Sequence, residues 1–478
     1  MTRTITIDPV TRIEGHARIT LQLDDGGHLV AARFHVTEYR GFERFCEGRP
    51  FTEMAGITAR ICGICPVSHL LAAARTGDGL LAVAVPPAAL ALRRLLNLAQ
   101  ISQSHALSFF HLSSPDFLLG WESDPARRNV FGLMAAEPEL ARAGIRLRQF
   151  GQQLIERLAG RRIHAAWAVP GGVRSPMTVE TRDWILEHLP EARATVALAL
   201  ERFKRLLDGP LQAEQHSFGH FPSLFLSLVG PGGLWEPCDG ALRLRGPDGA
   251  IVADDLEAAH YADFLAEAVE PWTYLKFPYY RPLGHPAGMY RVGPLARLNT
   301  CDRIGTPWAD AELAEFRQRG GGPVVLSSFA YHHARLVEIV ACLEQIGRHA
   351  ADPALLGGRV RAHAGLNANE AVGVSEAPRG TLFHHYTVDD NGLLTAVNLI
   401  IATGQNNLAM NHTVAQIART YLPDPVPAEV PEPLLNRLEA GIRCFDPCLS
   451  CSTHAAGAMP LQVELRAADG TLLAERRR

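Results

Sequence analysis

The sequence has little net charge and no apolar run long enough to cross a bilayer. Its 478 residues carry a formal net charge of -4 at pH 7, whereas proteins that bind nucleic acid or anionic membranes usually carry a basic excess. A membrane-spanning helix needs about 20 predominantly apolar residues, and the longest candidate, 392–403, is interrupted by Asn398. We therefore expect no nucleic-acid partner and no membrane span.

The first residues also lack the basic-then-apolar layout of a secretory signal, so we expect a cytoplasmic protein. No Gly-x-Gly-x-x-Gly follows a predicted strand, which argues against a dinucleotide site in this chain. Internal repeats and clean domain boundaries are absent as well. With 47% hydrophobic residues, the chain has enough apolar material for one large core or two fused ones.

Apolar residues recur with two different periods along the chain. Alternation around turn residues predicts antiparallel hairpins within 3–36, 230–253, 381–401 and 461–475. Stripes with helical spacing predict helices over 88–113, 139–158, 179–207, 331–347 and 405–421. The Pro- and Gly-rich region 272–306 is predicted as ordered loop, and the prolines of 423–433 as a stiff connector. The expected fold is α+β but predominantly α, with a central bundle of long helices and small peripheral antiparallel hairpins.

Nine cysteines are present, and four of them form two Cys-x-x-Cys pairs almost four hundred residues apart: Cys62 with Cys65, and Cys448 with Cys451. Random placement would give on the order of 0.2 such pairs, so two are significant. Four thiolates suit zinc, an iron-sulfur cluster or a nickel-bearing centre. Spacing alone favours structural zinc, but zinc ribbons draw both pairs from one short segment, and a chain of this size needs no metal to fold.

The two segments that carry these cysteines read RICGICPVSH over 60–69 and DPCLSCSTH over 446–454. They resemble the paired motifs of the large subunit of nickel-iron hydrogenases, without a departure. The similarity extends to RIEGH at 12–16, YRGFE at 39–43 and EAPRG at 376–380. Together with 405–411, these segments are most similar to the cytoplasmic, NAD-reducing, bidirectional group of that family.

The resemblance implies a nickel-iron centre whose iron carries carbon monoxide and cyanide. Cys62 and Cys448 would be terminal ligands of nickel, and Cys65 and Cys451 would bridge nickel to iron. H2 would be split heterolytically into a hydride and a proton, with Cys448 as the thiolate that takes the proton. Glu14 matches the glutamate of the family that carries this proton away, which requires hydrogen-bond reach of the thiol.

The same resemblance assigns supporting roles to side chains around the cysteines. Arg379 would hang over the diatomic ligands, held in place by Asp446 and Asp116. His69 would hydrogen-bond a bridging sulfur. Glu43 and His454 match ligands of a nearby magnesium site.

Twenty-four residues, 455–478, follow His454. Large subunits of this family are commonly made as precursors that an endopeptidase trims just after this histidine, once a maturation chaperone has supported nickel insertion. We therefore expect a single catalytic domain over 1–454 and a C-terminal extension over 455–478 that is removed. Alternatively, the extension stays and packs as a hairpin.

The resemblance thus implies the catalytic subunit of a hydrogenase that cleaves H2 reversibly. Because the chain has no further cysteine set for relay clusters, electrons would pass to a small subunit with an iron-sulfur cluster, and then to a diaphorase module with FMN and NAD. Three alternatives stay open: a hydrogen-sensing regulatory protein of the same fold, a related respiratory complex I subunit, which should lack the four cysteines, and a structural zinc protein without a redox role.

The remaining cysteines and the paired histidines match no metal motif. The simplest interpretation of the cysteines is that they are buried thiols, and that of the histidines is packing or hydrogen bonding: Cys46, Cys238, Cys301, Cys342 and Cys444, and His332, His333, His384 and His385.

Overall fold

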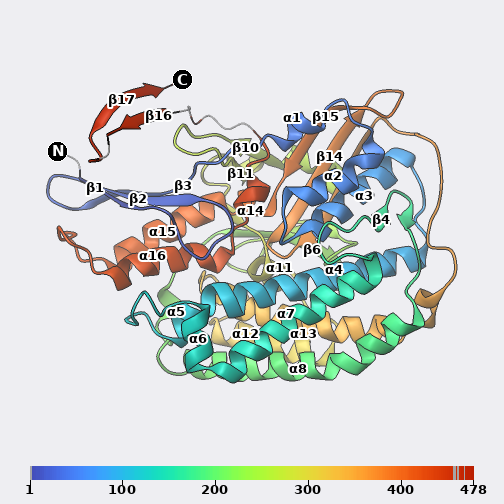
Figure 1. Cartoon of the computed structure of the whole chain (residues 1–478), viewed down its shortest axis with the longest axis horizontal. Helices are drawn as coiled ribbons and strands as arrows, with labels where there is room; N and C mark the ends of the chain where they lie inside the picture. The colour runs from blue at the N-terminus through green and yellow to red at the C-terminus, as the bar shows by residue number, and fades with distance from the viewer. Residues whose placement is uncertain (1–2, 456–458, 460–461, 468, 478) are drawn as a thin grey trace.

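A layer of long helices forms one side of the molecule (Figure 1). The computed structural model describes residues 3–455, 459, 462–467 and 469–477. The helices of the layer pack against one another in the order α7, α4, α13, α8, and α8 closes back on α7. Each of them lies where the apolar stripes predict a helix: α4 (Pro87–Leu107), α7 (Pro138–Ala159), α8 (Val179–Leu207) and α13 (Ala330–Ala350).

The sequence explains the local order of these helices. The Thr178 side chain caps α8 by accepting a hydrogen bond from the Thr181 amide. The apolar stripe of α4 is buried, including Leu92, Leu95 and Leu96. Helix α13 is buried around most of its circumference, which is typical of the central helix of a core. The predominantly α fold is thus confirmed.

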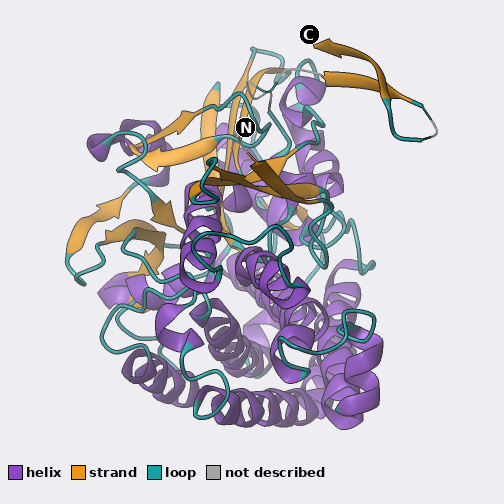
Figure 2. Cartoon of the chain, turned by 90° about the vertical axis from the view of Figure 1, so that its left-hand side faces the viewer, coloured by secondary structure: helices purple, strands orange, loops and turns teal. Residues whose placement is uncertain are grey.

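Two sheets lie on the side of the molecule opposite the long helices (Figure 2). One is an antiparallel sheet of β13 (Glu370–Ala377), β14 (Gly380–Val388) and β15 (Leu394–Ile400). The other runs in the order β12-β6-β8-β9: β6 (Leu224–Gly230) pairs with β12 (Tyr290–Arg291) on one side and, on the other, with the predicted hairpin of β8 (Ala241–Arg245) and β9 (Ile251–Leu256). Strand β6 is buried at every residue, so it carries no alternation that the sequence could reveal.

The N-terminal hairpin is a sheet of three strands, β1 (Arg3–Ile7), β2 (Ala17–Leu23) and β3 (Leu29–Val36). Strand β2 alternates buried and half-buried residues, as a sheet with one covered face requires. Strand β3 packs on α15 (Asn407–Tyr421), which the sequence predicts as a helix over 405–421.

The prediction of loop for one proline-rich region is wrong, and the predicted connector at 423–433 ends earlier than expected, since only 423–431 are free of helix and strand. Region 272–306 is not only loop, because it contains the fully buried helix α11 (Pro294–Thr300). The connector at 423–433 runs directly into α16 (Glu432–Phe445), with a proline in its first turn. Proline is favourable there because its missing N–H would have no helical partner and its fixed φ suits a helix start. Pro294 and Pro433 therefore lie in the first turn of a helix, which the loop and connector predictions did not include.

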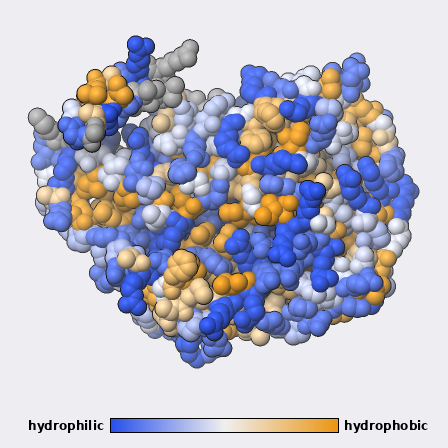
Figure 3. All heavy atoms as spheres, viewed as in Figure 1, coloured by the Kyte–Doolittle hydropathy of each residue, from blue (hydrophilic) through white to orange (hydrophobic). Residues whose placement is uncertain are grey.

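The C-terminal residues form the predicted hairpin, β16 (Gln462–Arg466) and β17 (Leu472–Arg477), whereas residues 461 and 468 of the prediction lie outside the described residues. Figures 1 and 2 show this hairpin standing away from the body. Its Leu465, Leu472 and Leu473 are exposed. On the face shown in Figure 3, hydrophilic and hydrophobic side chains are interspersed. Among the described residues, no helix is long and apolar enough to cross a membrane.

Candidate metal centre

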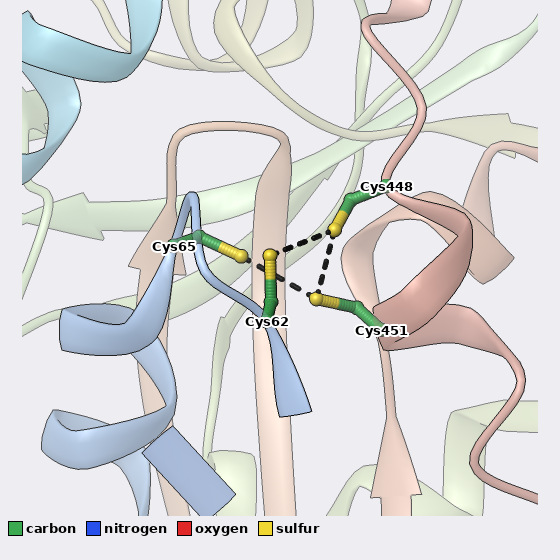
Figure 4. Close-up of side chains that lie close together, drawn as sticks. All are labelled: Cys62, Cys65, Cys448 and Cys451. Carbon is green, nitrogen blue, oxygen red and sulfur yellow. Dashed lines mark hydrogen bonds between the residues drawn. The ribbon is translucent and has the colours of Figure 1, made fainter. Parts of the chain in front are cut away.

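The two cysteine pairs meet between the helices and the β13–β15 sheet, and their four sulfur atoms lie within 4.8 Å of one another (Figure 4). Cys62 Sγ lies 3.2 Å from Cys448 Sγ, and Cys65 Sγ lies 3.4 Å from Cys451 Sγ. Corresponding positions of the two motifs are therefore neighbours. All nine cysteines are described, and all are buried and free, so the five outside the motifs are buried thiols as expected.

Each cysteine pair lies next to the start of a helix. Cys65 directly precedes α3 (Pro66–Leu81), which begins with a proline, and Cys62 ends the short helix before it. Cys448 directly precedes α17 (Leu449–Ser452), and Cys451 follows one turn later on the same face. The Cys448 amide donates to Thr403 Oγ1 at 3.0 Å, which fixes the start of α17.

The protonation of the sulfurs depends on burial and on their mutual contacts. Burial raises the pKa of Cys448 and of Cys451 well above the ordinary thiol value. Hydrogen bonding from Cys448 lowers the pKa of Cys62. Without a metal the group thus retains protons, and a bound cation would release them as it takes thiolate ligands.

Glu14 lies beside the second motif. The Leu449 amide donates to the Glu14 main-chain oxygen at 3.1 Å, and the Ser450 amide donates to Glu14 Oε2 at 3.0 Å. The Ser450 hydroxyl donates to the other carboxylate oxygen. Gly15 is required here, because its φ is +85° and a Cβ would lie 2.6 Å from Leu449 Cβ. The residue between the two cysteines therefore holds the carboxylate, and the backbone of Glu14 pairs with that of Cys448.

Arg379 reaches the cysteines from the turn between β13 and β14. Its Nε donates to the main-chain oxygen of Asp446. Its Nη2 lies 3.0 Å from Asp446 Oδ2 as an ion pair, without the alignment of a hydrogen bond. Burial by itself would lower the pKa of Arg379, but Asp446 and the cysteine sulfurs raise it, so the guanidinium stays charged. The expected support of Arg379 by Asp446 is confirmed as a contact.

The expected contact between Asp116 and Arg379 is wrong. The Asp116 carboxylate is paired with Arg12 and with Arg443, whose Nε donates to Oδ2 at 2.9 Å, and Asn436 Nδ2 donates to Oδ1 at 3.1 Å. Burial by itself would raise the pKa of Asp116, but Arg443 and Arg12 lower it. Two guanidinium groups satisfy this carboxylate, so it joins the N-terminal segment to α16 instead.

His69 lies against Cys451, a cysteine of the second motif. Its Nε2 is 3.3 Å from Cys451 Sγ, and its Nδ1 is 3.1 Å from His384 Nε2. Burial lowers the pKa of His69 to about 4, so the ring is neutral. His384 is a hydrogen-bonding residue as predicted, but its place behind His69 was not foreseen.

Glu43 and His454 also meet, with Glu43 Oε1 2.9 Å from His454 Nδ1. The Leu399 amide donates to the same carboxylate oxygen at 2.8 Å. Arg40 connects the motifs, because its Nη1 donates to the carbonyls of Ile61 at 2.6 Å and Ser450 at 3.1 Å. The segment 39–43 thus contains an arginine that links the two cysteine segments.

A small cavity adjoins the sulfurs and tests which group fits. Its lining includes Cys65, Cys448, Cys451, His69, Arg379 and Thr403. Arg379 Nη2 is buried without a hydrogen-bond partner in the described structure. A structural zinc site is closed by its four ligands and needs neither space nor a spare donor. A larger centre with polar diatomic ligands uses both, so the residues fit a nickel-iron centre.

Sequence reasoning missed the residues that orient this site. Ser450 could have been singled out only by its place between Cys448 and Cys451, since its contacts with Glu14 come from a distant segment. Ser104, whose Oγ accepts from Arg379 Nη1 at 3.4 Å, and Thr403 carry no local pattern that marks them.

Comparison with known proteins agrees with this geometry. Residues 4–39 match the HoxL-like family and residues 40–123 the nickel-dependent hydrogenase family. The chain is 40% identical over 491 residues to the beta subunit of the NAD-reducing hydrogenase HoxS of Cupriavidus necator, with 100% of both chains covered. It is also 40% identical over 459 residues to an F420-non-reducing hydrogenase polypeptide of Methanothermobacter thermautotrophicus, with 94% of each covered.

Solved structures show the same fold. A crystal structure of an NAD+-reducing [NiFe]-hydrogenase in the H2-reduced state superposes with a TM-score of 0.91 at 46% identity, covering 95% of this chain and 99% of that one. The Ni-Fe-Se hydrogenase of D. vulgaris Hildenborough shares the fold at a TM-score of 0.74 and 23% identity, covering 95% and 100%. The chain therefore belongs to the nickel-dependent hydrogenase family, as a nickel-iron hydrogenase large subunit.

Proposed function

We propose that this chain is the catalytic subunit of a hydrogenase that cleaves H2 reversibly into protons and electrons. The observation that carries the proposal is the buried group of four thiols beside a cavity that Arg379 and His69 help to line. Cys62 and Cys448 would hold nickel, and Cys65 and Cys451 would bridge it to iron. When bound, this centre supplies the Lewis-acid and redox chemistry, with carbon monoxide and cyanide on the iron.

The protein then handles the proton. Cys448 is the thiolate that would take the proton from H2. Glu14 accepts the proton next, because its backbone pairs with that of Cys448 and its carboxylate is fixed by Ser450. Arg379, held by Asp446, would supply N–H donors to the cyanide ligands. His69 donates to Cys451 and so limits the charge on that sulfur.

Glu43 and His454 would hold a magnesium ion near the site. A carboxylate and an imidazole provide two ligands, and magnesium keeps several waters when few protein ligands are present. Burial by itself would raise the pKa of Glu43, but the His454 contact lowers it, which keeps an anion available for the cation.

The electrons would leave through a partner small subunit with an iron-sulfur cluster, and then through a diaphorase module with FMN to NAD, in the cytoplasm. The F420-non-reducing relative is as similar in identity as the NAD-reducing one, so identity alone does not identify the acceptor. Coverage of 100% of the NAD-reducing relative and the TM-score of 0.91 to an NAD+-reducing structure favour NAD.

We further propose that the mature catalytic domain is 1–454 and that 455–478 are removed by an endopeptidase, after a maturation chaperone has assisted metal insertion. Two observations support this. The first is that the β16–β17 hairpin stands apart from the body. The second is that the solved NAD+-reducing structure covers 95% of this chain, whereas the sequence of the HoxS beta subunit covers 100% of it. Removal would free a carboxylate at His454, beside Glu43.

Metal analysis combined with infrared spectroscopy of the purified complex tests the function. The expected result is nickel and iron together with carbonyl and cyanide stretches, and NAD reduction under H2. Zinc alone without those stretches would refute the proposal. A metal-loaded protein that binds H2 without turnover would favour the hydrogen sensor.

A further inference from the structure

A fully buried arginine lies behind the turn that carries Arg379. Arg297 belongs to α11, and its side chain is 0% exposed. Its Nε and Nη2 donate to the two oxygens of Glu338, both at 2.6 Å. Its Nη1 donates to Glu376 Oε2 at 2.8 Å. A guanidinium placed between two carboxylates in a dry core is strongly oriented.

The remaining N–H groups of Arg297 reach the backbone next to Arg379. Nη1 donates to the Ala377 carbonyl at 2.9 Å, and Nη2 donates to the Pro378 carbonyl at 3.2 Å. A guanidinium has five N–H donors, and all five of Arg297 are thus used. Two of them hold the residues that directly precede Arg379.

The acceptors are themselves fixed from other elements. Glu338 on α13 also accepts from His105 Nε2 and from Trp235 Nε1, each at 2.8 Å. Glu376 on β13 accepts at Oε1 from the Leu228 amide at 2.9 Å and from Thr381 Oγ1 at 2.7 Å. Arg297 therefore ties the turn to the helix layer and to the sheet of β6.

The residue after Arg379 is constrained as well. Gly380 has a φ of +135°, and a Cβ there would lie 2.4 Å from the Val292 side chain. The backbone is thus held on both sides of Arg379. Replacing all members of a buried ionic group by hydrophobic side chains often leaves the stability of the fold unchanged, because the charges then need not be removed from water. Stability alone is a weak reason for so many charges behind this turn.

We propose that Arg297 is a positioning residue for the reaction: by holding the Ala377 and Pro378 carbonyls, it sets where the Arg379 guanidinium meets the metal centre. This inference rests on the proposed function. Lysine at 297 keeps the charge but has three donors that cannot form the two-sided fork, so the turn shifts while the fold is retained.

The test compares Arg297→Lys with a matched control, Arg93→Lys, in the complete metal-loaded complex. Arg93 is also a buried arginine with a two-oxygen contact to one carboxylate, Asp78, and with two carbonyl acceptors, those of Val169 and Gly172. It belongs to α4 and contacts no residue of the β13–β14 turn in the described structure. Infrared stretches of the cyanide ligands, kcat and KM for H2 are measured for both.

We expect Arg297→Lys to retain nickel and iron, to shift the cyanide stretches, and to lower kcat by about 10- to 100-fold with little change in KM. Arg93→Lys leaves the stretches and kcat unchanged. In a double-mutant cycle with Arg379→Lys, adding Arg297→Lys causes little further loss, because both changes act through one guanidinium.

Unchanged stretches and kcat in Arg297→Lys overturn the proposal, as do equal effects of Arg93→Lys or additive losses in the double variant. If Arg297→Lys yields no metal-loaded complex, Glu338→Gln is measured in its place, since this variant keeps Arg297 and weakens the contact that orients it. A shift of the cyanide stretches relative to the unmodified complex then supports the proposal. Unchanged stretches overturn it. An unmodified complex without cyanide stretches would instead refute the proposed function.

Discussion

Cys62 Sγ lies 3.2 Å from Cys448 Sγ, although 386 residues separate the two cysteines. Each motif alone would place two thiols at a helix start, which is common in metal sites of many kinds. Their meeting requires the starts of α3 and α17, which Cys65 and Cys448 directly precede, to lie side by side. The site is therefore complete only when the whole chain has folded, and metal binding to the four sulfurs reports on the tertiary structure.

Cys448→Ser is expected to abolish H2 turnover. A hydroxyl is a harder and far less acidic ligand than a thiol, so it binds nickel poorly and does not take over the proton step. H2/D2 exchange of the purified complex measures the loss. Cys342→Ala is the matched control, because Cys342 is also fully buried and lies outside the site. Normal exchange in Cys448→Ser would contradict the assigned role.

Glu14→Gln is expected to impair proton release more than hydrogen binding. The amide oxygen can still accept from the Ser450 amide, but the side chain no longer accepts a proton, so kcat falls by about 100-fold or more while KM changes little. Ser450→Ala keeps the backbone donor and should cause a smaller loss. Equal kcat values for the unmodified protein and Glu14→Gln would exclude Glu14 from the proton path.

The acid sensitivity of the fold should depend on Glu338. Burial by itself would raise its pKa, but Arg297 and His105 hold the pKa at about 2, below the ordinary 4.5. A carboxyl with a lowered folded-state pKa stabilises the fold above the unfolded value, by about 3 kcal/mol here, and this is lost as pH falls from about 4.5 to about 2.

Glu338→Gln is therefore expected to be less stable than the unmodified protein at neutral pH, with a gap that narrows below about pH 4.5. The midpoint of thermal unfolding across this range measures the gap. Glu187→Gln serves as control, because this side chain is 77% exposed. A gap that stays constant or widens on acidification would show that Glu338 does not stabilise the fold through its charge.

The mature active protein is expected to end at His454. Intact mass spectrometry of the fully active complex measures this directly. The control is the same protein produced without nickel, in which the full-length mass should persist because trimming follows metal insertion. A fully active enzyme whose mass includes 455–478 would refute the processing proposal.

Local patterns in the sequence were enough for the long helices and for most of the site. Helix α8 covers the predicted 179–207, because its apolar stripe reports the buried face directly. The contacts of His69 with Cys451, and of Glu43 with His454, join residues that the motif similarity had already grouped. Helix α11 and strand β6 were missed because they are buried on all sides, so neither shows the alternation that marks a half-exposed element.

The sequence by itself determined the chemistry available to this protein: four soft thiolates in two helix-start motifs, a glutamate, an arginine and a chain without relay clusters. Only the tertiary structure decided which groups meet. It placed Asp116 on Arg12 and Arg443, and away from Arg379, and it put all five donors of Arg297 to use behind the Arg379 turn. Periodicity and spacing encode contacts within one element, whereas ion pairs between distant segments depend on how whole elements pack.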